Sequence, residues 1–96
     1  MKTVELFHLP GCPYCIKAKK AIQELIEENP AYAEISINWI NEREQAEYAG
    51  SRDYYYVPTI FFENEKLYEA HPDQSLKEIK KCIRTAFDRV LLQGFE

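Results

Sequence analysis

The stretch HLPGCPYCIKAKKAI, residues 8–22, decides how this chain is interpreted, because it contains two closely spaced cysteines. Cys12 and Cys15 flank Pro13 and Tyr14, after a β-rich run and before apolar residues that recur at helical spacing. A Cys-x-x-Cys pair of this kind can be a redox site, half of a metal site, or two buried thiols that happen to be close. The residues around the pair distinguish these three interpretations.

The elements on either side place the pair at the start of a helix. Residues 3–9 carry apolar side chains on both alternating faces, which is typical of an interior strand. A Pro-Gly loop follows, and Pro13 suits the first turn of a helix, where its missing N–H costs nothing. We expect this helix to end at Asn29-Pro30, with an apolar stripe made of Ile16, Ala18, Ala21, Ile22, Leu25 and Ile26.

The rest of the chain predicts three more strands and two more helices. Strands are expected at residues 33–41, 58–62 and 67–68, and helices at residues 42–50 and 74–92. A β-α-β opening implies a right-handed crossover between parallel strands, whereas the short turn between the last two strands implies an antiparallel hairpin. The order β-α-β-α-β-β-α therefore predicts an α/β fold with a four-stranded mixed sheet and helices on both faces.

The length, composition and charge of the chain argue against several classes of function. The chain has 96 residues, 46% of them hydrophobic, which predicts one domain over residues 1–96. We expect no membrane partner and a cytoplasmic location, because the sequence has no long apolar run and its start lacks the apolar core of a signal peptide. A net charge of −4 argues against a nucleic-acid partner. Three cysteines do not suit a disulfide scaffold, so a close pair in a reducing cytosol is catalytic or metal-binding.

The position of the pair favours redox chemistry. Cys12 falls near the N-cap of the predicted helix, where unpaired N–H groups and the helix dipole favour an anion, so we expect it to be the attacking thiolate. Cys15 lies about one turn further in, more covered, and suits the resolving role. A zinc site would need two more ligands, and Cys82, His8 and His71 do not have metal-motif spacing. We therefore expect no metal.

Two segments of the chain resemble those of a known family. Cys12-Pro13-Tyr14-Cys15 resembles the dithiol motif of glutaredoxins, and Val57-Pro58 followed by TIFF resembles their VP-x-IF segment. The likeness covers about residues 3–90. It implies a thioredoxin fold with Cys12 and Cys15 as catalytic residues and with Pro58 in the cis form facing them. It also implies substrate binding by Tyr14, Pro58 and the backbone of Val57, which would pair with an extended thiol substrate.

The chain departs from the family where glutathione is usually held. Glutaredoxins commonly have a lysine three residues before the first cysteine, a threonine before Val-Pro, and a Gly-Gly pair followed by an acidic pair. At these places the present chain has Leu9, Tyr56, Tyr68-Glu69 and His71-Pro72. Glu69 would repel an anionic ligand if it pointed into the site. The redox chemistry is thus expected to be retained, whereas most of the glutathione cradle is not.

The resemblance implies an enzyme, a thiol-disulfide oxidoreductase that reduces protein or glutathione mixed disulfides. It would have no tightly bound cofactor and would use glutathione as a co-substrate. One alternative is an electron carrier fed by thioredoxin reductase, which the missing glutathione contacts favour. Another is a non-catalytic redox-sensing or cluster-binding module, against which Pro13 argues because cluster-holding members usually have monothiol or glycine-containing motifs. We expect a monomer whose partners are a disulfide-containing protein or small thiol and one of these two reductants.

Several residues near the motif have two interpretations. Tyr54, Tyr55 and Tyr56 would form either a substrate-binding rim or a packing cluster whose hydroxyl groups reach water. His8, near the end of the first strand, borders the predicted site, although a structural role is favoured, and His71 is expected to be a loop residue. Cys82 in the last helix is expected to be a packed or half-exposed thiol.

Overall fold

The computed structural model describes residues 2–93 and has the predicted element order with one addition. Its strands are β1 (Lys2–His8), β2 (Ile35–Asn41), β3 (Thr59–Phe62) and β4 (Glu65–Glu69). Its helices are α1 (Pro13–Glu28), α2 (Ala46–Gly50) and α3 (Leu76–Gln93). The addition is a 3-10 helix, η1 (Pro30–Glu34), between α1 and β2. The predicted single domain spans residues 1–96, of which residues 1 and 94–96 lie outside the described part.

The four strands form one mixed sheet in the order β2-β1-β3-β4. Strand β1 pairs with β2 in parallel, from Lys2 opposite Ile35 to His8 opposite Asn41. It pairs with β3 in antiparallel fashion, and β3 and β4 form the antiparallel hairpin. Strand β1 is therefore interior, as its apolar residues on both faces predict, and its C-terminal end leads directly to the cysteine pair.

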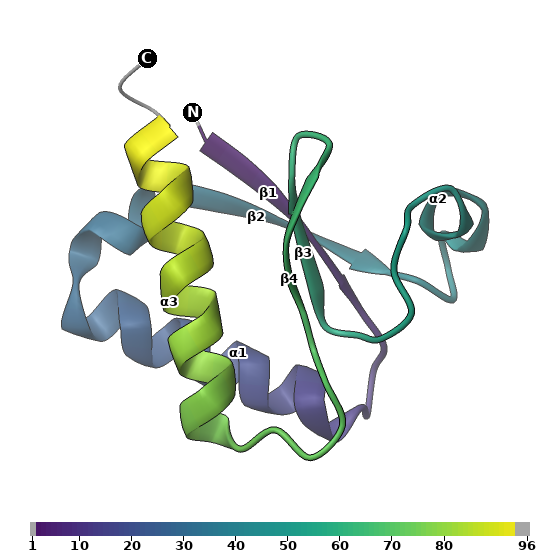
Figure 1. Ribbon diagram of the computed structural model, residues 1–96, viewed down its shortest axis with the longest axis horizontal. Coiled ribbons are helices and arrows are strands. Elements are labelled where there is room, and N and C mark those ends of the chain that lie inside the picture. The colour runs from purple at the N-terminus through teal and green to yellow at the C-terminus, as the bar shows by residue number, and fades with distance from the viewer. Residues whose placement is uncertain (1, 94–96) are drawn as a thin grey trace.

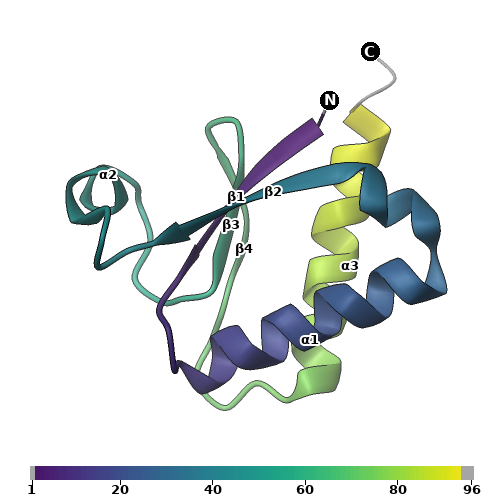
Figure 2. The same ribbon diagram turned by 180° about the vertical axis from the view of Figure 1, so that it is seen from behind.

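Helices cover both faces of the sheet, as predicted. Helices α1 and α3 lie together on one side and α2 lies on the other (Figures 1 and 2). Val4 and Leu6 of β1 belong to the larger core under α1 and α3, whereas Phe7 belongs to a smaller core with Ala49 of α2. None of the helices within residues 2–93 combines the length and the apolar character needed to cross a membrane.

At three of the element boundaries that differ from the prediction, side chains bond to nearby backbone N–H groups. Residues 33–34 belong to η1 rather than to β2, since Asn29 Oδ1 accepts from the Ala31 N–H at 3.1 Å. Residues 42–45 form a turn before α2, because Asn41 Oδ1 accepts from the N–H groups of Arg43 and Glu44. Helix α3 begins at Leu76 rather than at residue 74, after a cap provided by Ser75.

One predicted core residue is wrong. Ile16 was expected on the apolar stripe of the first helix, yet 61% of its surface is exposed. The buried side of α1 is instead formed by Cys15, Ala18, Ala21, Ile22 and Leu25. Ile16 lies in the first turn, where its N–H bonds to the carbonyl of Cys12. It is therefore an exposed apolar residue beside the cysteine pair.

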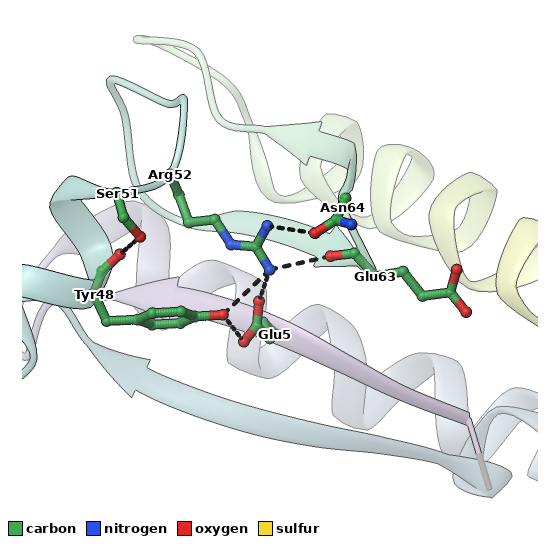
Figure 3. A network of polar contacts seen from close by, with 6 residues as sticks. All are labelled: Glu5, Tyr48, Ser51, Arg52, Glu63 and Asn64. Atoms are coloured by element: carbon green, nitrogen blue, oxygen red, sulfur yellow. Dashed lines mark hydrogen bonds and ion pairs between the residues drawn. The ribbon is translucent and has the colours of Figure 1, made fainter.

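A polar network attaches the segment after α2 to the sheet (Figure 3). Arg52 Nη2 lies 2.6 Å from Glu5 Oε1 on β1, and the hydroxyl of Tyr48 bonds to the same carboxylate. The Arg52 guanidinium also donates to the carbonyl of Glu63 and to Asn64 Oδ1. Because residues 53–58 follow directly, this network fixes one end of the loop that carries the Val57-Pro58 bond.

Candidate active site

Cys12 occupies the N-cap position of α1, as predicted. Its backbone is extended, with φ −70° and ψ 123°, and Pro13 begins the helix. The Cys12 thiol is half-buried, and its Sγ lies 4.0 Å from the carbonyl oxygen of Val57. The peptide bond between Val57 and Pro58 is cis, as the resemblance implied. The structure thus places Cys12 opposite the Val57 backbone, although these residues come from distant parts of the chain.

Cys15 lies behind Cys12 and is only 8% exposed. Burial raises the pKa of the Cys15 thiol to about 12, and interactions with Cys12 and Glu42 act in the same direction, whereas a backbone N–H at Leu9 opposes them. The two thiols therefore differ in the way the sequence predicted, with one accessible sulfur and one covered sulfur. All three cysteines are free thiols in the structure.

Tyr14 connects the motif to the loop before α3. Its hydroxyl accepts a hydrogen bond from the Asp73 N–H at 2.7 Å, and Lys17 Nζ lies 5.4 Å from the centre of its ring. Asp73 has a positive φ of 69°. The aromatic ring expected to contact substrate is therefore also a structural contact between α1 and residues 71–75.

Glu69 does not present a free charge to the site. Its Oε2 accepts from the N–H groups of Tyr55 at 2.5 Å and Tyr56 at 2.8 Å, and its Oε1 pairs with Lys66 at 2.7 Å. Although partial burial opposes it, these contacts lower the pKa of the Glu69 carboxyl. Glu69 therefore holds the loop that precedes Val57 in place, at a position where most glutaredoxins would have glycine.

Of the three consecutive tyrosines, the first is packed against the core and the other two are exposed. Tyr54 packs against Phe7, with ring centres 5.0 Å apart, and its hydroxyl donates to Glu42 Oε1 at 2.6 Å. Tyr55 is 87% exposed and Tyr56 is 51% exposed. Only the last two therefore have the exposed side chains that a substrate-binding rim would need.

The remaining candidate residues differ in their surroundings. His71 is exposed in the loop before α3, and His8 is half-buried against Trp39. Cys82 is half-buried and lines a separate cavity of about 510 Å³ with Tyr68 and Gln74. Within residues 2–93, no three histidine, cysteine or acidic side chains are arranged to hold a metal ion.

Comparison with known proteins decides the family. The family model for glutaredoxin matches residues 4–67, about two thirds of the chain. This chain belongs to the glutaredoxin family. Glutaredoxin 1 of Rickettsia conorii is 37% identical over 67 residues, which cover 67% of the present chain and 61% of the relative. The chain thus matches about three fifths of the length of that glutaredoxin.

Members of the wider superfamily are also similar. A thioredoxin of Methanocaldococcus jannaschii is 31% identical over 82 residues, covering 83% of this glutaredoxin-family chain and 94% of the relative. The structure of thioredoxin 1 from Thermosipho africanus superposes with a TM-score of 0.59 at 20% identity, covering 98% of this chain and 99% of that one. The thioredoxin fold predicted for the chain is therefore confirmed.

Two site contacts could not be found from the sequence. The bond between Tyr14 and Asp73 joins residues 59 positions apart, and that between Glu69 and the Tyr55 N–H joins residues 14 apart. No periodicity or motif indicates either contact, because both arise where loops from different elements meet. The one available signal was the unusual residue at position 69, and its charge suggested repulsion rather than attachment.

Proposed function

We propose that this glutaredoxin-family chain is a thiol-disulfide oxidoreductase that uses Cys12 and Cys15 as its dithiol. One observation carries the proposal: a half-buried thiol at the start of α1 faces the Val57 carbonyl, with a second, covered thiol behind it. The arrangement provides one sulfur for an incoming disulfide and a second sulfur within reach of the first. The dithiol is itself the redox group, so the scheme needs no tightly bound cofactor.

The reaction takes place in two displacements. The Cys12 thiolate attacks a substrate disulfide, the substrate S–S bond breaks, and a mixed disulfide forms on Cys12. The unpaired N–H groups at the start of α1 stabilise the negative charge of the attacking thiolate. Cys15 then attacks Cys12 Sγ, which releases the second substrate thiol and closes the Cys12–Cys15 disulfide. The substrate gains two electrons and the dithiol loses them.

The substrate would bind beside the cis peptide bond. An extended chain could pair with the backbone of Val57, as a strand adds to the edge of a sheet. Ile16 and Tyr55, both exposed and apolar in part, lie in the segments that flank Cys12 and Val57. These features support a disulfide within a polypeptide as the substrate, with Tyr14 and Pro58 completing the contact surface.

A second candidate function differs only in the reductant. In this version a thioredoxin reductase, rather than glutathione, restores the dithiol. Leu9 replaces the usual lysine, and Glu69 is bound to the loop N–H groups of Tyr55 and Tyr56. The likeness to an archaeal thioredoxin over 94% of that protein points the same way. Glutathione would have only Tyr14 and the Val57 backbone among the expected contacts.

One coupled assay tests both versions. The reduced protein is given a small mixed disulfide and NADPH oxidation is followed with two regenerating systems, glutathione with its reductase or thioredoxin reductase alone. Activity only in the first identifies glutathione as the co-substrate, and activity only in the second identifies the carrier function. The matched control is Cys82→Ser, which should retain the parent rate. If Cys12→Ser is as active as the parent in either system, the proposed dithiol is wrong.

A further inference from the structure

The resolving cysteine borders a cavity between the end of β1, the first turns of α1 and Trp39 of β2. It has a volume of about 260 Å³, and Cys15, His8, Lys19 and Trp39 contribute to its wall. A second hollow of about 390 Å³ is lined by the same histidine, lysine and tryptophan. Because one water molecule occupies roughly 30 Å³ of liquid, the first cavity has room for several. The covered thiol therefore borders a space that can hold water.

His8 has a fixed place in the wall of this cavity. It is the last residue of β1, and the alternation of the strand puts its side chain on the same face as Val4 and Leu6, beneath α1. Its ring meets the Trp39 ring edge-on, with centres 5.6 Å apart, and Lys19 Nζ lies 5.4 Å from the centre of the Trp39 ring. The imidazole is thus held between β2 and the first turns of α1, where Cys15 lies.

We propose that His8 accepts the proton of the Cys15 thiol, through water in this cavity, when Cys15 resolves the mixed disulfide on Cys12. The inference rests on the proposed function and deepens it. The Cys15 S–H bond breaks and its proton passes to the imidazole. A bond then forms between Cys15 Sγ and Cys12 Sγ while the bond from Cys12 to the substrate sulfur breaks. The substrate leaves as a thiolate, and the imidazolium later returns its proton to solvent.

The pKa shifts of His8 and Cys15 agree with their roles as proton acceptor and proton donor. Burial, and next the charge of Lys19, lower the pKa of His8 below its ordinary 6.5, whereas Glu44 acts in the opposite direction. The imidazole is then largely neutral near pH 7 and can accept a proton. Burial, the largest cause, raises the pKa of the Cys15 thiol whether or not Cys12 is bonded to the substrate, so this thiol needs a proton acceptor in order to attack.

The other groups that face Cys15 are less suited to take its proton. Cys12 is bonded to the substrate during this step. Glu42 lines a different cavity beside α2, where its Oε1 already accepts from the Tyr54 hydroxyl. Burial raises the pKa of Tyr68, which therefore stays protonated, and its hydroxyl donates to Gln74 Oε1. Among these neighbours, His8 is the base that shares the cavity with Cys15.

Stopped-flow reaction with 5,5′-dithiobis(2-nitrobenzoate) separates the two steps. Attack by Cys12 releases one coloured thiolate, and resolution by Cys15 releases the second. All proteins carry Cys82→Ser so that only the motif reacts. We expect His8→Gln to leave the first phase unchanged and to slow the second about 100-fold, the low end of what general-base catalysis contributes. We also expect the variant to lose the inflection below pH 6.5 in the rate of the second phase.

Two charge variants keep the test independent of any effect of His8→Gln on folding. Lys19→Met removes a charge that lowers the pKa of His8, so the inflection should move to higher pH. Glu44→Gln removes a charge that raises it, so the inflection should move to lower pH. A purely structural role for the histidine would not produce two shifts of opposite sign.

The controls separate failure of this inference from failure of the proposed function. His71→Gln, at the exposed histidine, should keep both phases and the inflection. If the first phase is absent from the parent, the proposed dithiol chemistry is wrong. If both phases are present and the second keeps its rate and inflection in His8→Gln, the dithiol stands and the role of His8 is overturned.

Discussion

Cys12 and Cys15 belong to one short motif but experience different surroundings. Cys12 lies at the open end of α1 and faces Val57, whereas Cys15 is one turn further along and faces the core. Residues three apart lie on the same face of a helix, so the two sulfurs are neighbours, and Cys15 is the more covered because it lies one turn further from the open end. The different environments of the two sulfurs therefore depend on where the motif lies in the fold as well as on its residue types.

This difference predicts how the reduced protein reacts with iodoacetamide. Only the thiolate is alkylated, and the pKa of Cys15 is about 12, so near pH 7 Cys12 should be modified while Cys15 is not. The thiolate fraction of Cys15 rises roughly tenfold per pH unit below its pKa, so its labelling should increase steeply as the pH is raised. Timed alkylation followed by peptide mass spectrometry measures both rates. Equal labelling near pH 7 would contradict the assigned environments.

Much of the residue-level site could be predicted from the sequence, for identifiable reasons. The spacing and flanking residues of the motif gave Cys12 its position, and the resemblance gave Pro58 its cis form. Ile16 was misplaced because helical spacing identifies an apolar stripe but not where the covering element ends. The contact of Tyr14 with Asp73 depends on how two distant loops meet, which no local pattern records.

At the scale of elements, α3 begins with a reciprocal cap. The Ser75 hydroxyl accepts from the Glu78 N–H at 3.2 Å, and Glu78 Oε1 accepts from the Ser75 N–H at 3.0 Å. We predict that Ser75→Ala lowers the free energy of unfolding by about 1 kcal/mol, as loss of an N-cap usually does. Urea denaturation measures the change. The control Thr85→Ala, in mid-helix on the surface, should stay within about 0.5 kcal/mol of the parent.

The loop that carries Val57 depends on Glu69 of β4. Partial burial opposes ionisation of this carboxyl, but its bonds to Lys66, Tyr55 and Tyr56 lower its pKa below the ordinary 4.5. A lowered folded-state pKa stabilises the fold above the ordinary value, and this contribution is lost as the pH falls through the folded-state pKa. We therefore predict that Glu69→Gln is less stable than the parent near neutral pH and that the two converge in acid.

Denaturation curves at neutral and acidic pH measure this convergence. Glu63→Gln is the matched control, because Glu63 contributes only its carbonyl oxygen to the Arg52 network. If the stability difference between Glu69→Gln and the parent were the same at both pH values, the carboxylate would not be the group that holds the loop.

Element boundaries were predicted less well than element types, for a physical reason. Alternating and helical patterns identify where apolar faces lie, whereas ends depend on single hydrogen bonds. Asn41 illustrates this, since its side-chain oxygen accepts from two following N–H groups and delays α2 until Ala46. Asn29 similarly begins η1, because its side-chain oxygen accepts from the Ala31 N–H. The last two residues of η1, 33–34, were therefore predicted wrongly as the start of the following strand.

At the scale of the molecule, the core under α1 and α3 stabilises the fold and supports the site. Phe87 of α3 is fully buried, with its ring 6.0 Å from that of Tyr32 in η1. We predict that Phe87→Ala lowers the free energy of unfolding by about 3–5 kcal/mol. That is a large part of the roughly 5–15 kcal/mol available to a typical domain. Leu92→Ala, where the parent side chain is 69% exposed, should have little effect. Urea denaturation of both variants gives the comparison.

The overall topology was predictable because several independent features of the sequence agreed. The two-sided apolar pattern of residues 3–9, the β-α-β opening and the short turn before residue 67 indicated an interior first strand, a parallel pair and an antiparallel hairpin, and the observed mixed sheet has all three. The region where glutathione would bind was less predictable. Glu69 and the loop it holds show that a substitution can create a new internal contact as well as remove an old one.

The measurement that tests the central claim most directly is the intact mass of Cys15→Ser after reaction with a disulfide substrate. The account predicts a stable adduct of one substrate thiol on Cys12, located by peptide mapping and absent from the Cys12→Ser protein treated in the same way. The parent should instead lose two hydrogens and retain no adduct, since Cys15 closes the disulfide. An adduct found mainly on Cys82, or on Cys15 in the Cys12→Ser protein, would contradict the account.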